Sequence, residues 1–488
     1  MKTLAKISII LLMIIGLFSC ELPDNVDPKN PTQVPASTLL TNAEIALADQ
    51  VSTADYNDNI GRFLAQYWTE VTYLDEVQYN FQDRQIPDEY WEEYYSLILV
   101  DFQETKNIVN AGEYTSAQEG MVKNKLAIVD ILMVYCYQNL VDAFGDVPYT
   151  EALDPDNVTP AYDDAKTIYQ DLIDRLTQDI ADLDPNEPSW GGEELIYGGD
   201  PASWRRFAAS LKLRMAMRMA DEDPGYAETV ATEAISEGIF TSQDQSAYWE
   251  YLGTSPHVHS IYGDFVLEGR KDYVPVATYV NLAESLNDPR LDNLVTHADT
   301  TGDGVPDGYV PQPYGVKVDN YAQVSQLADE FLEPDFGHMY IDYVEMRFLL
   351  AEAAARNFAV TGTAEEHYNA AITESVLRWH GTVGEANAYL AQADVAWATA
   401  PGDWRQKIGT QKWLAFYNRG NEGWSVWRQF DWPTFVPPPG FTYDDIPERY
   451  PYPFSESTLN KENYDAASSK IGGDSPQTLI FWDEDKEQ

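Results

Sequence analysis

Apolar side chains recur at steps of three and four residues through much of this chain, which is typical of amphipathic helices. The clearest stripe lies between residues 117 and 144 and comprises Val122, Leu126, Val129, Met133, Tyr137, Leu140 and Phe144. The other faces of that segment are also largely apolar, so we expect a central helix that is covered on several sides. Gly145, followed by Pro148, predicts where this helix ends.

The same periodicity predicts a series of further helices. One is expected to begin at Thr159-Pro160, a capping residue followed by proline in the first turn, and to run to Leu183. The segment 201–220 alternates locally with period two, but it contains strong helix formers and no β-branched residue, which favours a helix. Other helices are expected at residues 225–236, 340–358, 364–380, 385–399 and 406–418.

Three stretches lack this periodicity and are too long to be simple connections. They are rich in Gly, Pro, Tyr and Asp and comprise residues 241–276, 298–333 and 432–488. Several predicted helices fall into antiparallel pairs, as in tetratricopeptide-like solenoids, although no strict repeat of about 34 residues is present. We therefore predict a mainly α-helical protein, a tetratricopeptide-like scaffold with long irregular, ligand-facing excursions, in one domain over residues 36–488.

Residues 1–19 have the pattern of a bacterial secretory signal peptide, with Lys2 and Lys6 before an apolar run. About 12 apolar residues would span ~18 Å as a helix, which is too short for the ~30 Å core of a bilayer. The ending Leu-Phe-Ser-Cys resembles the lipobox of bacterial lipoproteins, which implies lipidation of Cys20; the alternative is an ordinary secreted protein. Residues 20–35 would form a lipidated tether, whose acidic start resembles a surface-export signal of Bacteroidetes lipoproteins or is only a polar spacer.

The charge balance excludes two classes of partner. With 31 basic and 80 acidic residues the net charge is −49, which argues against nucleic acid and against adhesion to anionic lipid. The 32 Tyr, 18 Phe and 13 Trp argue against disorder. Apart from Cys20 the chain has only Cys136, which we expect in the core of the central helix, so no disulfide stabilises the mature domain.

Three blocks of the sequence resemble one family. Residues 144–153 read Phe-Gly-Asp-Val-Pro-Tyr-Thr-Glu-Ala-Leu, residues 203–216 read Ser-Trp-Arg-Arg-Phe-Ala-Ala-Ser-Leu-Lys-Leu-Arg-Met-Ala, and residues 449–456 read Arg-Tyr-Pro-Tyr-Pro-Phe-Ser-Glu. These blocks are similar to signatures of the SusD/RagB-like outer-membrane lipoproteins, and the resemblance extends from the lipobox to about residue 464. They are scaffold signatures, so no ligand contact transfers from them.

The resemblance implies a SusD-like fold and a lipoprotein on the outer membrane that faces the cell exterior and touches the membrane only through its lipid. It also implies a role as a lid over a SusC-like TonB-dependent transporter, to which the protein delivers a nutrient. Most characterised relatives bind glycans, so an oligosaccharide is the first expectation. A peptide-binding member of the same family is the alternative.

No catalytic signature is present. The chain lacks Gly-x-Ser-x-Gly, Gly-x-x-x-x-Gly-Lys-Ser/Thr and His-Glu-x-x-His, and the one close histidine pair, His257 and His259, has no third ligand nearby. We expect a protein that is not an enzyme and requires no cofactor. The rival interpretation is an acidic glycan-active hydrolase, which would need two carboxylates in a cleft, one of them with a raised pKa.

Aromatic residues supply the candidate ligand contacts. Sugar rings stack their C–H faces on aromatic rings, while neighbouring polar groups bind the hydroxyls. Two clusters have polar residues interleaved, and the candidates are Trp68, Tyr73, Tyr79 and Phe81 in the first and Trp249, Tyr251 and Tyr262 in the second. The competing explanation for each ring is the core, which is favoured for Trp91, Tyr94 and Tyr95.

One loop has the pattern of a calcium site. Asp299, Thr301 and Asp303 place oxygen donors at alternate positions, a glycine follows for the sharp turn, and Val305 and Asp307 would add a carbonyl and a carboxylate. The loop resembles calcium loops of EF-hand-like and thrombospondin-type repeats, but it has Thr where Asp or Asn is usual and no Glu at the twelfth position. We expect a possible structural Ca²⁺; the alternative is a Gly/Asp turn without an ion.

One basic island stands out in the acidic chain and comprises Arg205, Arg206, Lys212, Arg214 and Arg218. It could hold an acidic sugar. We expect instead that these residues pair with carboxylates of the chain itself, because they lie in one of the scaffold blocks.

Overall fold

The computed structural model describes residues 34–53 and 59–483. The predicted signal peptide, Cys20 and all but the last two residues of the tether lie outside this part of the chain. The described chain is mainly helical, as the sequence predicts, with three small two-stranded sheets.

The helices are α2 (Ala36–Ser52), α3 (Gly61–Leu64), α4 (Ile86–Glu92), α5 (Val100–Ala111), α6 (Glu119–Phe144), α7 (Ala165–Asp182), α8 (Pro201–Arg218), α9 (Pro224–Glu237), α10 (Ser260–Tyr262), α11 (Ala277–Ser285), α12 (Leu291–Leu294), α13 (Tyr343–Ala355), α14 (Ala364–Arg378), α15 (Val383–Leu390), α16 (Trp404–Ala415), α17 (Gly420–Phe430), α18 (Phe454–Leu459) and α19 (Lys461–Lys470). A π-helical stretch, Glu93–Leu99, joins α4 to α5. The antiparallel strand pairs are β1 (Trp68–Glu70) with β5 (Tyr273–Pro275), β2 (Val147–Pro148) with β3 (Tyr162–Asp163), and β4 (Ala247–Trp249) with β6 (His338–Ile341).

The central helix is α6, and it confirms the expectation from its apolar stripe. Every side chain from Ile131 to Phe144 is buried, Cys136 among them. Gly145 ends the helix with a positive φ of 82°, and its N–H donates to the carbonyl oxygen of Val141. By length and composition Ser116–Phe144 could cross a membrane, but 94% of its apolar window is buried inside the protein, so it is the core helix of this domain.

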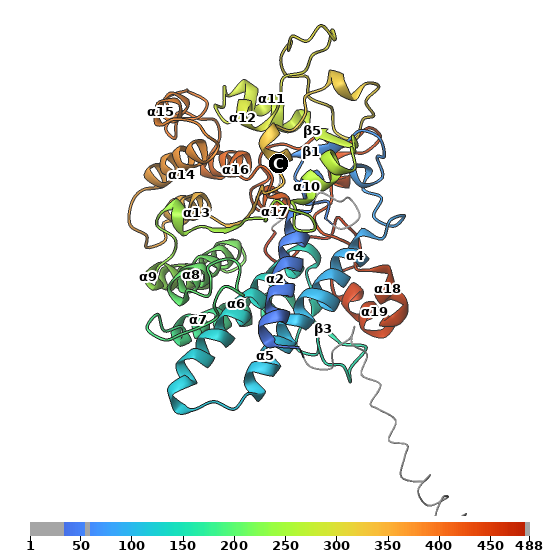
Figure 1. Cartoon of the computed structure of the whole chain (residues 1–488). Helices are drawn as coiled ribbons and strands as arrows, with labels where there is room; N and C mark the ends of the chain where they lie inside the picture. The colour runs from blue at the N-terminus through green and yellow to red at the C-terminus, as the bar shows by residue number, and fades with distance from the viewer. Residues whose placement is uncertain (1–33, 54–58, 484–488) are drawn as a thin grey trace, which may run out of the picture.

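Consecutive helices pack side by side on both sides of α6. On the left of Figure 1, α6, α7, α8 and α9 form one stack, and α13, α14, α15 and α16 continue it. This arrangement confirms the predicted scaffold of helix pairs. The opposite half contains α2, α4, α5, α18 and α19, and the irregular stretches lie above and beside it.

The helix that the sequence predicts from Thr159 begins instead at Ala165. Asp164 is its N-cap, and the Asp164 carboxylate accepts the N–H of Thr167 at 3.0 Å. The residues just before it form β3, and the carboxylate of Asp163 accepts the N–H of Thr150 at 2.8 Å. These bonds hold the segment against β2, so the helix cannot extend back to residue 159.

Two other helices are shorter than their periodicity suggests. The helix expected from residue 340 begins at Tyr343, because residues 338–341 pair with β4 as strand β6. The helix expected to reach residue 399 ends at Leu390 and is followed by turns. The last irregular stretch contains two helices that the sequence analysis did not predict, α18 and α19.

Most residues of the basic island form ion pairs with carboxylates of the chain itself, which confirms the expectation for them. Arg214 contacts Glu345 at 2.8 Å and Glu422 at 3.0 Å. Arg218 contacts Glu422 at 2.6 Å, and Lys212 contacts two carboxylates of α9. Because Lys212, Arg214 and Arg218 are all buried, this part of the island offers no surface to an acidic sugar.

Candidate ligand-binding pocket

Three of the predicted ligand-binding rings lie in the core. Trp68, Trp249 and Tyr251 are 1%, 5% and 5% exposed. The Trp68 ring stacks on Tyr273 with 5.7 Å between ring centroids, and the Tyr251 hydroxyl donates to Asp49 at 2.9 Å. The structure thus corrects the expectation for these three residues, because their faces are covered by protein and leave no place for a sugar.

The other four predicted rings are not equivalent. Tyr73 is 52% exposed and lies under the guanidinium of Arg84, 5.6 Å from its ring centroid. Tyr262 is half-buried at the end of α10 and is not among the residues that line the pocket described next. Tyr79, which is half-buried, and Phe81, which is buried, both contribute to the wall of one pocket.

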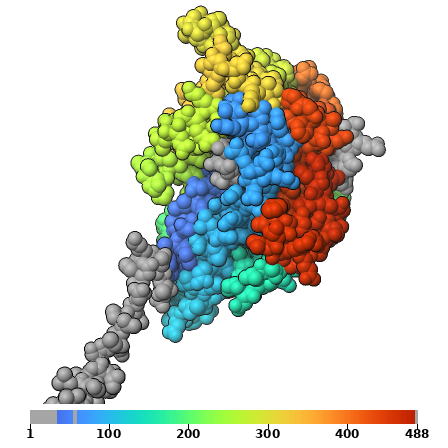
Figure 2. All heavy atoms as spheres, turned by 90° about the vertical axis from the view of Figure 1, so that its right-hand side faces the viewer, coloured from blue at the N-terminus to red at the C-terminus, as the bar shows by residue number. Residues whose placement is uncertain are grey.

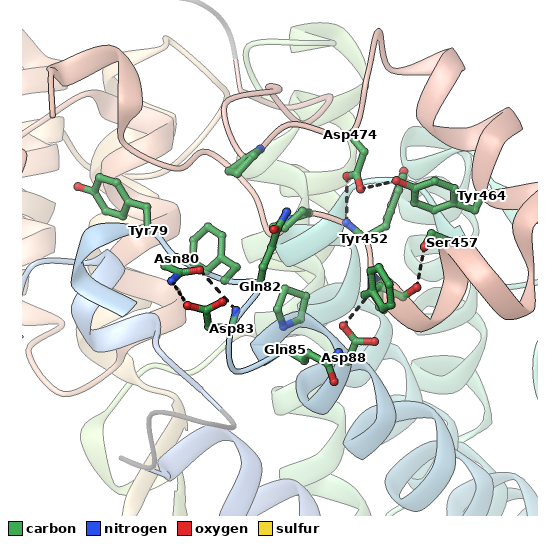
Figure 3. Close-up of a pocket in the computed structure, with 16 residues that line it drawn as sticks. Tyr79, Asn80, Gln82, Asp83, Gln85, Asp88, Tyr452, Ser457, Tyr464 and Asp474 are labelled. Atoms are coloured by element: carbon green, nitrogen blue, oxygen red, sulfur yellow. Dashed lines mark hydrogen bonds between the residues drawn. The ribbon is translucent and has the colours of Figure 1, made fainter. Parts of the chain in front are cut away.

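This pocket has a volume of about 610 Å³, within the ordinary range of ligand sites. It lies between two segments far apart in the sequence, 79–88 and 451–476, which meet on one face of the molecule (Figures 2 and 3). Its lining comprises Tyr79, Asn80, Phe81, Gln82, Asp83, Gln85, Pro87, Asp88, Pro451, Tyr452, Pro453, Phe454, Ser457, Tyr464, Asp474 and Pro476.

Two carboxylates fix the walls of the pocket. The two oxygens of Asp88 accept the N–H groups of Phe454 and Ser455, at 2.9 and 2.8 Å, and so tie the start of α18 to the start of α4. On the other side, Asp474 accepts the N–H of Tyr452 at 2.9 Å and the hydroxyl of Tyr464 at 3.1 Å. The pocket is therefore held open by hydrogen bonds within the folded chain (Figure 3).

The groups left for a ligand are amides and one exposed ring. The side chains of Gln82 and Gln85 are exposed and form no hydrogen bond within the described chain. Phe454 is 65% exposed, which is unusual for a large apolar side chain. An open aromatic face beside unpaired amides is the combination that binds the C–H face and the hydroxyls of a sugar.

The phenols of the pocket are neutral hydrogen-bonding groups. Burial raises the pKa of Tyr79, Tyr452 and Tyr464 above its usual value. None of them ionises near neutral pH, so each keeps its O–H. The formal charge of the lining therefore comes from Asp83, Asp88 and Asp474, and no Lys, Arg or His is among the described residues that line it.

Sequence reasoning missed the half of the pocket that lies near the C-terminus. Tyr452 and Phe454 belong to the closing block at 449–456, whose resemblance to the family indicated a scaffold role only. One signal was available, since an aromatic residue with prolines around it in an irregular stretch has few neighbours to bury it. Its proximity to residues 79–88 could not be predicted from local sequence.

The acidic loop protrudes from the top of the molecule (Figure 1), and its carboxylates are bound to the loop itself. Asp299 accepts the N–H of Gly304 at 2.7 Å and the hydroxyl of Thr301 at 3.3 Å, while Asp303 and Asp307 each accept a backbone N–H. In the described parts of the chain, no three His, Cys, Asp or Glu side chains are arranged to hold a metal ion. Calcium binding therefore stays a prediction, and an ion would have to replace these bonds.

Close carboxylate pairs do occur, as the hydrolase interpretation requires, but one is inaccessible. Glu70 and Glu76 lie against each other at 1% and 0% exposure, and burial raises the pKa of Glu70 to about 10. Asp49 and Glu93 line a separate hollow of about 390 Å³, and burial raises the pKa of both. Of these two pairs, the second lines a hollow that a substrate could enter.

Comparisons with known proteins agree with the fold. Residues 28–453 match the model of a SusD-like family described as starch-binding and associating with the outer membrane. A solved chitin-binding protein is 24% identical, with 92% of this chain and 99% of that chain covered and a TM-score of 0.79. A chitin-binding SusD homologue from Flavobacterium johnsoniae is 22% identical, with coverage of 92% and 98% and a TM-score of 0.77.

A SusD homologue from Bacteroides uniformis is also 22% identical, with coverage of 92% and 99% and a TM-score of 0.79. No curated protein sequence matches this chain. The similarity to these solved structures shows the fold alone. The family model matches residues 28–453, which is most of the chain.

Proposed function

This chain belongs to the SusD-like family of starch-binding proteins that associate with the outer membrane, and from that membership we propose that it captures an oligosaccharide at the cell surface. It would pass the sugar, chemically unchanged, to a SusC-like TonB-dependent transporter. The family supports the surface location and the glycan as ligand. The transporter, the delivery step and the lipid anchor at Cys20 are parts of the proposal.

The observation that carries the proposal is the pocket between residues 79–88 and 451–476. It combines the exposed ring of Phe454 with the unpaired amides of Gln82 and Gln85, and its walls are fixed by Asp88 and Asp474. A pre-formed site loses little conformational entropy on binding, which favours affinity for a flexible sugar chain.

Two of the similar solved structures are described as chitin-binding, so oligomers of N-acetylglucosamine are the first ligands to test, followed by oligomers of glucose. Binding to purified protein lacking residues 1–20 would be measured by titration calorimetry. We expect Phe454→Ala to weaken binding roughly two- to tenfold, because stacking on one aromatic ring contributes ~0.5–1.5 kcal/mol.

The matched control is Tyr114→Ala, which removes a ring that is 40% exposed but lies between α5 and α6, away from the pocket. Equal loss of binding in both variants would remove the pocket from the proposal. Binding of peptides alone on a combined glycan and peptide array would replace the oligosaccharide by the peptide alternative.

The proposal that no chemistry occurs is tested separately. After prolonged incubation with each oligosaccharide that binds, chromatography should recover only the intact sugar. Asp49→Asn and Glu93→Gln serve as probes, because these carboxylates have raised pKa values and line a hollow. Cleavage by the wild type that either variant abolishes would establish the hydrolase instead.

A further inference from the structure

The pocket has a distinctive charge, and we infer from it that the protein selects uncharged or amine-bearing glycans and rejects polyanionic ones such as polyuronates. This inference rests on the proposed function and adds the chemical class of the sugar. It follows from the carboxylates that line the pocket, from how the neighbouring cations are paired, and from the surface that continues beyond α18.

Three carboxylates line the pocket; Arg449 pairs with Asp474, and in the described part of the chain no basic side chain pairs with Asp83 or Asp88. Asp83 is exposed, and its one side-chain partner is the neutral amide of Asn80, 2.7 Å away. The bonds to Asp88 come only from backbone N–H groups, which leave its charge in place. A sugar carboxylate in this space would meet repulsion without a salt bridge in return.

Two arginines close to the lining residues are paired with carboxylates, one of them with Asp474 of the lining itself. Arg449 is buried beside the pocket and contacts Asp474 at 2.8 Å. Arg84 lies between two lining residues in the sequence, but its guanidinium contacts the buried Glu76 at 2.7 Å. Neither arginine is among the residues that line the pocket, so neither offers a ligand there the bidentate contact with which proteins bind anionic sugars.

The same charge continues on the other side of α18. This short helix contributes Phe454 and Ser457 to the pocket and Glu456 to a second hollow of about 490 Å³. The second hollow also contains the carboxylates of Glu104 and Asp154, and no Lys, Arg or His is among its described lining residues. A glycan chain that leaves the pocket across α18 therefore meets further negative charge.

Hydroxyl and acetamido groups suit this surface, because carboxylates accept hydrogen bonds from O–H and N–H donors and free amides supply both donors and acceptors. An ammonium group on an amino sugar would gain attraction at the same positions. The pocket thus distinguishes sugars by charge while the ring of Phe454 contacts any of them.

The test compares three hexamers of similar size: N-acetylglucosamine, glucose and galacturonic acid. Wild-type protein lacking residues 1–20 should bind at least one neutral hexamer and should bind the galacturonate hexamer at least about tenfold more weakly. That difference should narrow as salt is raised, because screening weakens repulsion between exposed charges.

Asp83→Asn is the informative variant, since asparagine can still accept the hydrogen bond from Asn80. It should reduce the ratio of the neutral-hexamer affinity to the galacturonate affinity roughly threefold or more, because one repelling charge is removed. Glu365→Gln is the matched control, because it removes one exposed carboxylate from α14, in the helix stack on the far side of the molecule. It should change neither affinity.

Galacturonate binding as tight as neutral binding in the wild type would overturn the inference and leave the proposed function intact. An unchanged preference in Asp83→Asn would overturn it as well. If the wild type binds no oligosaccharide of any charge, the proposed function itself fails, and the inference fails with it.

Discussion

At the scale of single residues, the buried pair Glu70 and Glu76 gives a stability prediction with a definite sign. Burial first, and then the contact with Glu76, raise the pKa of Glu70 to about 10. The folded chain keeps a proton that the unfolded chain releases above its ordinary pKa of 4.5, so this residue lowers stability increasingly as pH rises from 4.5 towards 10.

Glu70→Gln keeps the shape and a donor towards Glu76 but removes the ionisation. At pH 8 we expect the variant to have a higher Tm than the wild type and a free energy of unfolding larger by at least ~1 kcal/mol. Near pH 4 we expect the two proteins to be equally stable. Calorimetric melting across this range checks it, with Glu365→Gln at an exposed position of α14 as control. A variant that is less stable than the wild type at pH 8 would contradict the assignment.

The acidic loop at 299–307 gives a second prediction at this scale. If the loop holds a structural Ca²⁺, EDTA should lower the Tm of the wild type. An unchanged Tm would indicate a Gly/Asp turn without an ion, held by the backbone N–H groups that its aspartates already accept. Calcium that binds only to the folded state would stabilise that state by ~2.7 kcal/mol when its free concentration is a hundred times its Kd. A rise in Tm with millimolar calcium that is absent in Asp303→Ala would establish the calcium site.

At the scale of elements, the end of α6 depends on one glycine. Gly145 has a φ of 82° and a ψ of −120°, a conformation that side chains with a Cβ rarely adopt. Gly145→Ala should therefore destabilise by about 1–3 kcal/mol, measured by denaturant unfolding. Gly225→Ala is the control, since Gly225 lies in the first turn of α9, has open space around its Cα and has no positive φ.

We expect the control to be neutral or slightly stabilising, because alanine has the higher helix propensity. Equal destabilisation in both variants would mean that the loss comes from the added methyl group and not from the backbone conformation. Helix ends of this kind were accessible from the sequence, since a glycine after the last apolar position marks them. The start of α7 was not, because the competing bonds of Asp163 come from residues 149–150, ten or more positions away.

At the scale of the whole molecule, attachment to the membrane depends on Cys20 in our proposal. Cys20→Ala should leave the protein unprocessed or released from the membrane fraction, because no other segment of the chain is proposed to hold it there. Fractionation followed by immunoblotting measures this. Protease added to intact cells should digest the wild type, and full protection while the outer membrane is sealed would contradict the surface location.

Whole-molecule packing also decided which aromatic rings are available. Trp68 and Tyr73 lie five residues apart in one aromatic cluster of the sequence, yet the first is 1% exposed and the second 52%. The local sequence around a ring that packs in the core does not differ in composition or spacing from the sequence around a ring that faces solvent. Only the position of β1 against β5, more than 200 residues later, covers Trp68 with Tyr273.

Helical periodicity and caps predicted most of the longer helices between residues 117 and 418, and the signature blocks indicated the family, because these are local properties. They did not predict α2, α5, α17, α18 or α19. The sequence by itself also determined that the chain is acidic and that the lone Cys136 belongs to the core. The pocket, in contrast, depends on tertiary packing, since residues 79–88 and 451–476 are joined by hydrogen bonds that Asp88 accepts from the first N–H groups of α18. No local pattern encodes a contact across more than 360 residues, because such a contact depends on how every intervening element packs.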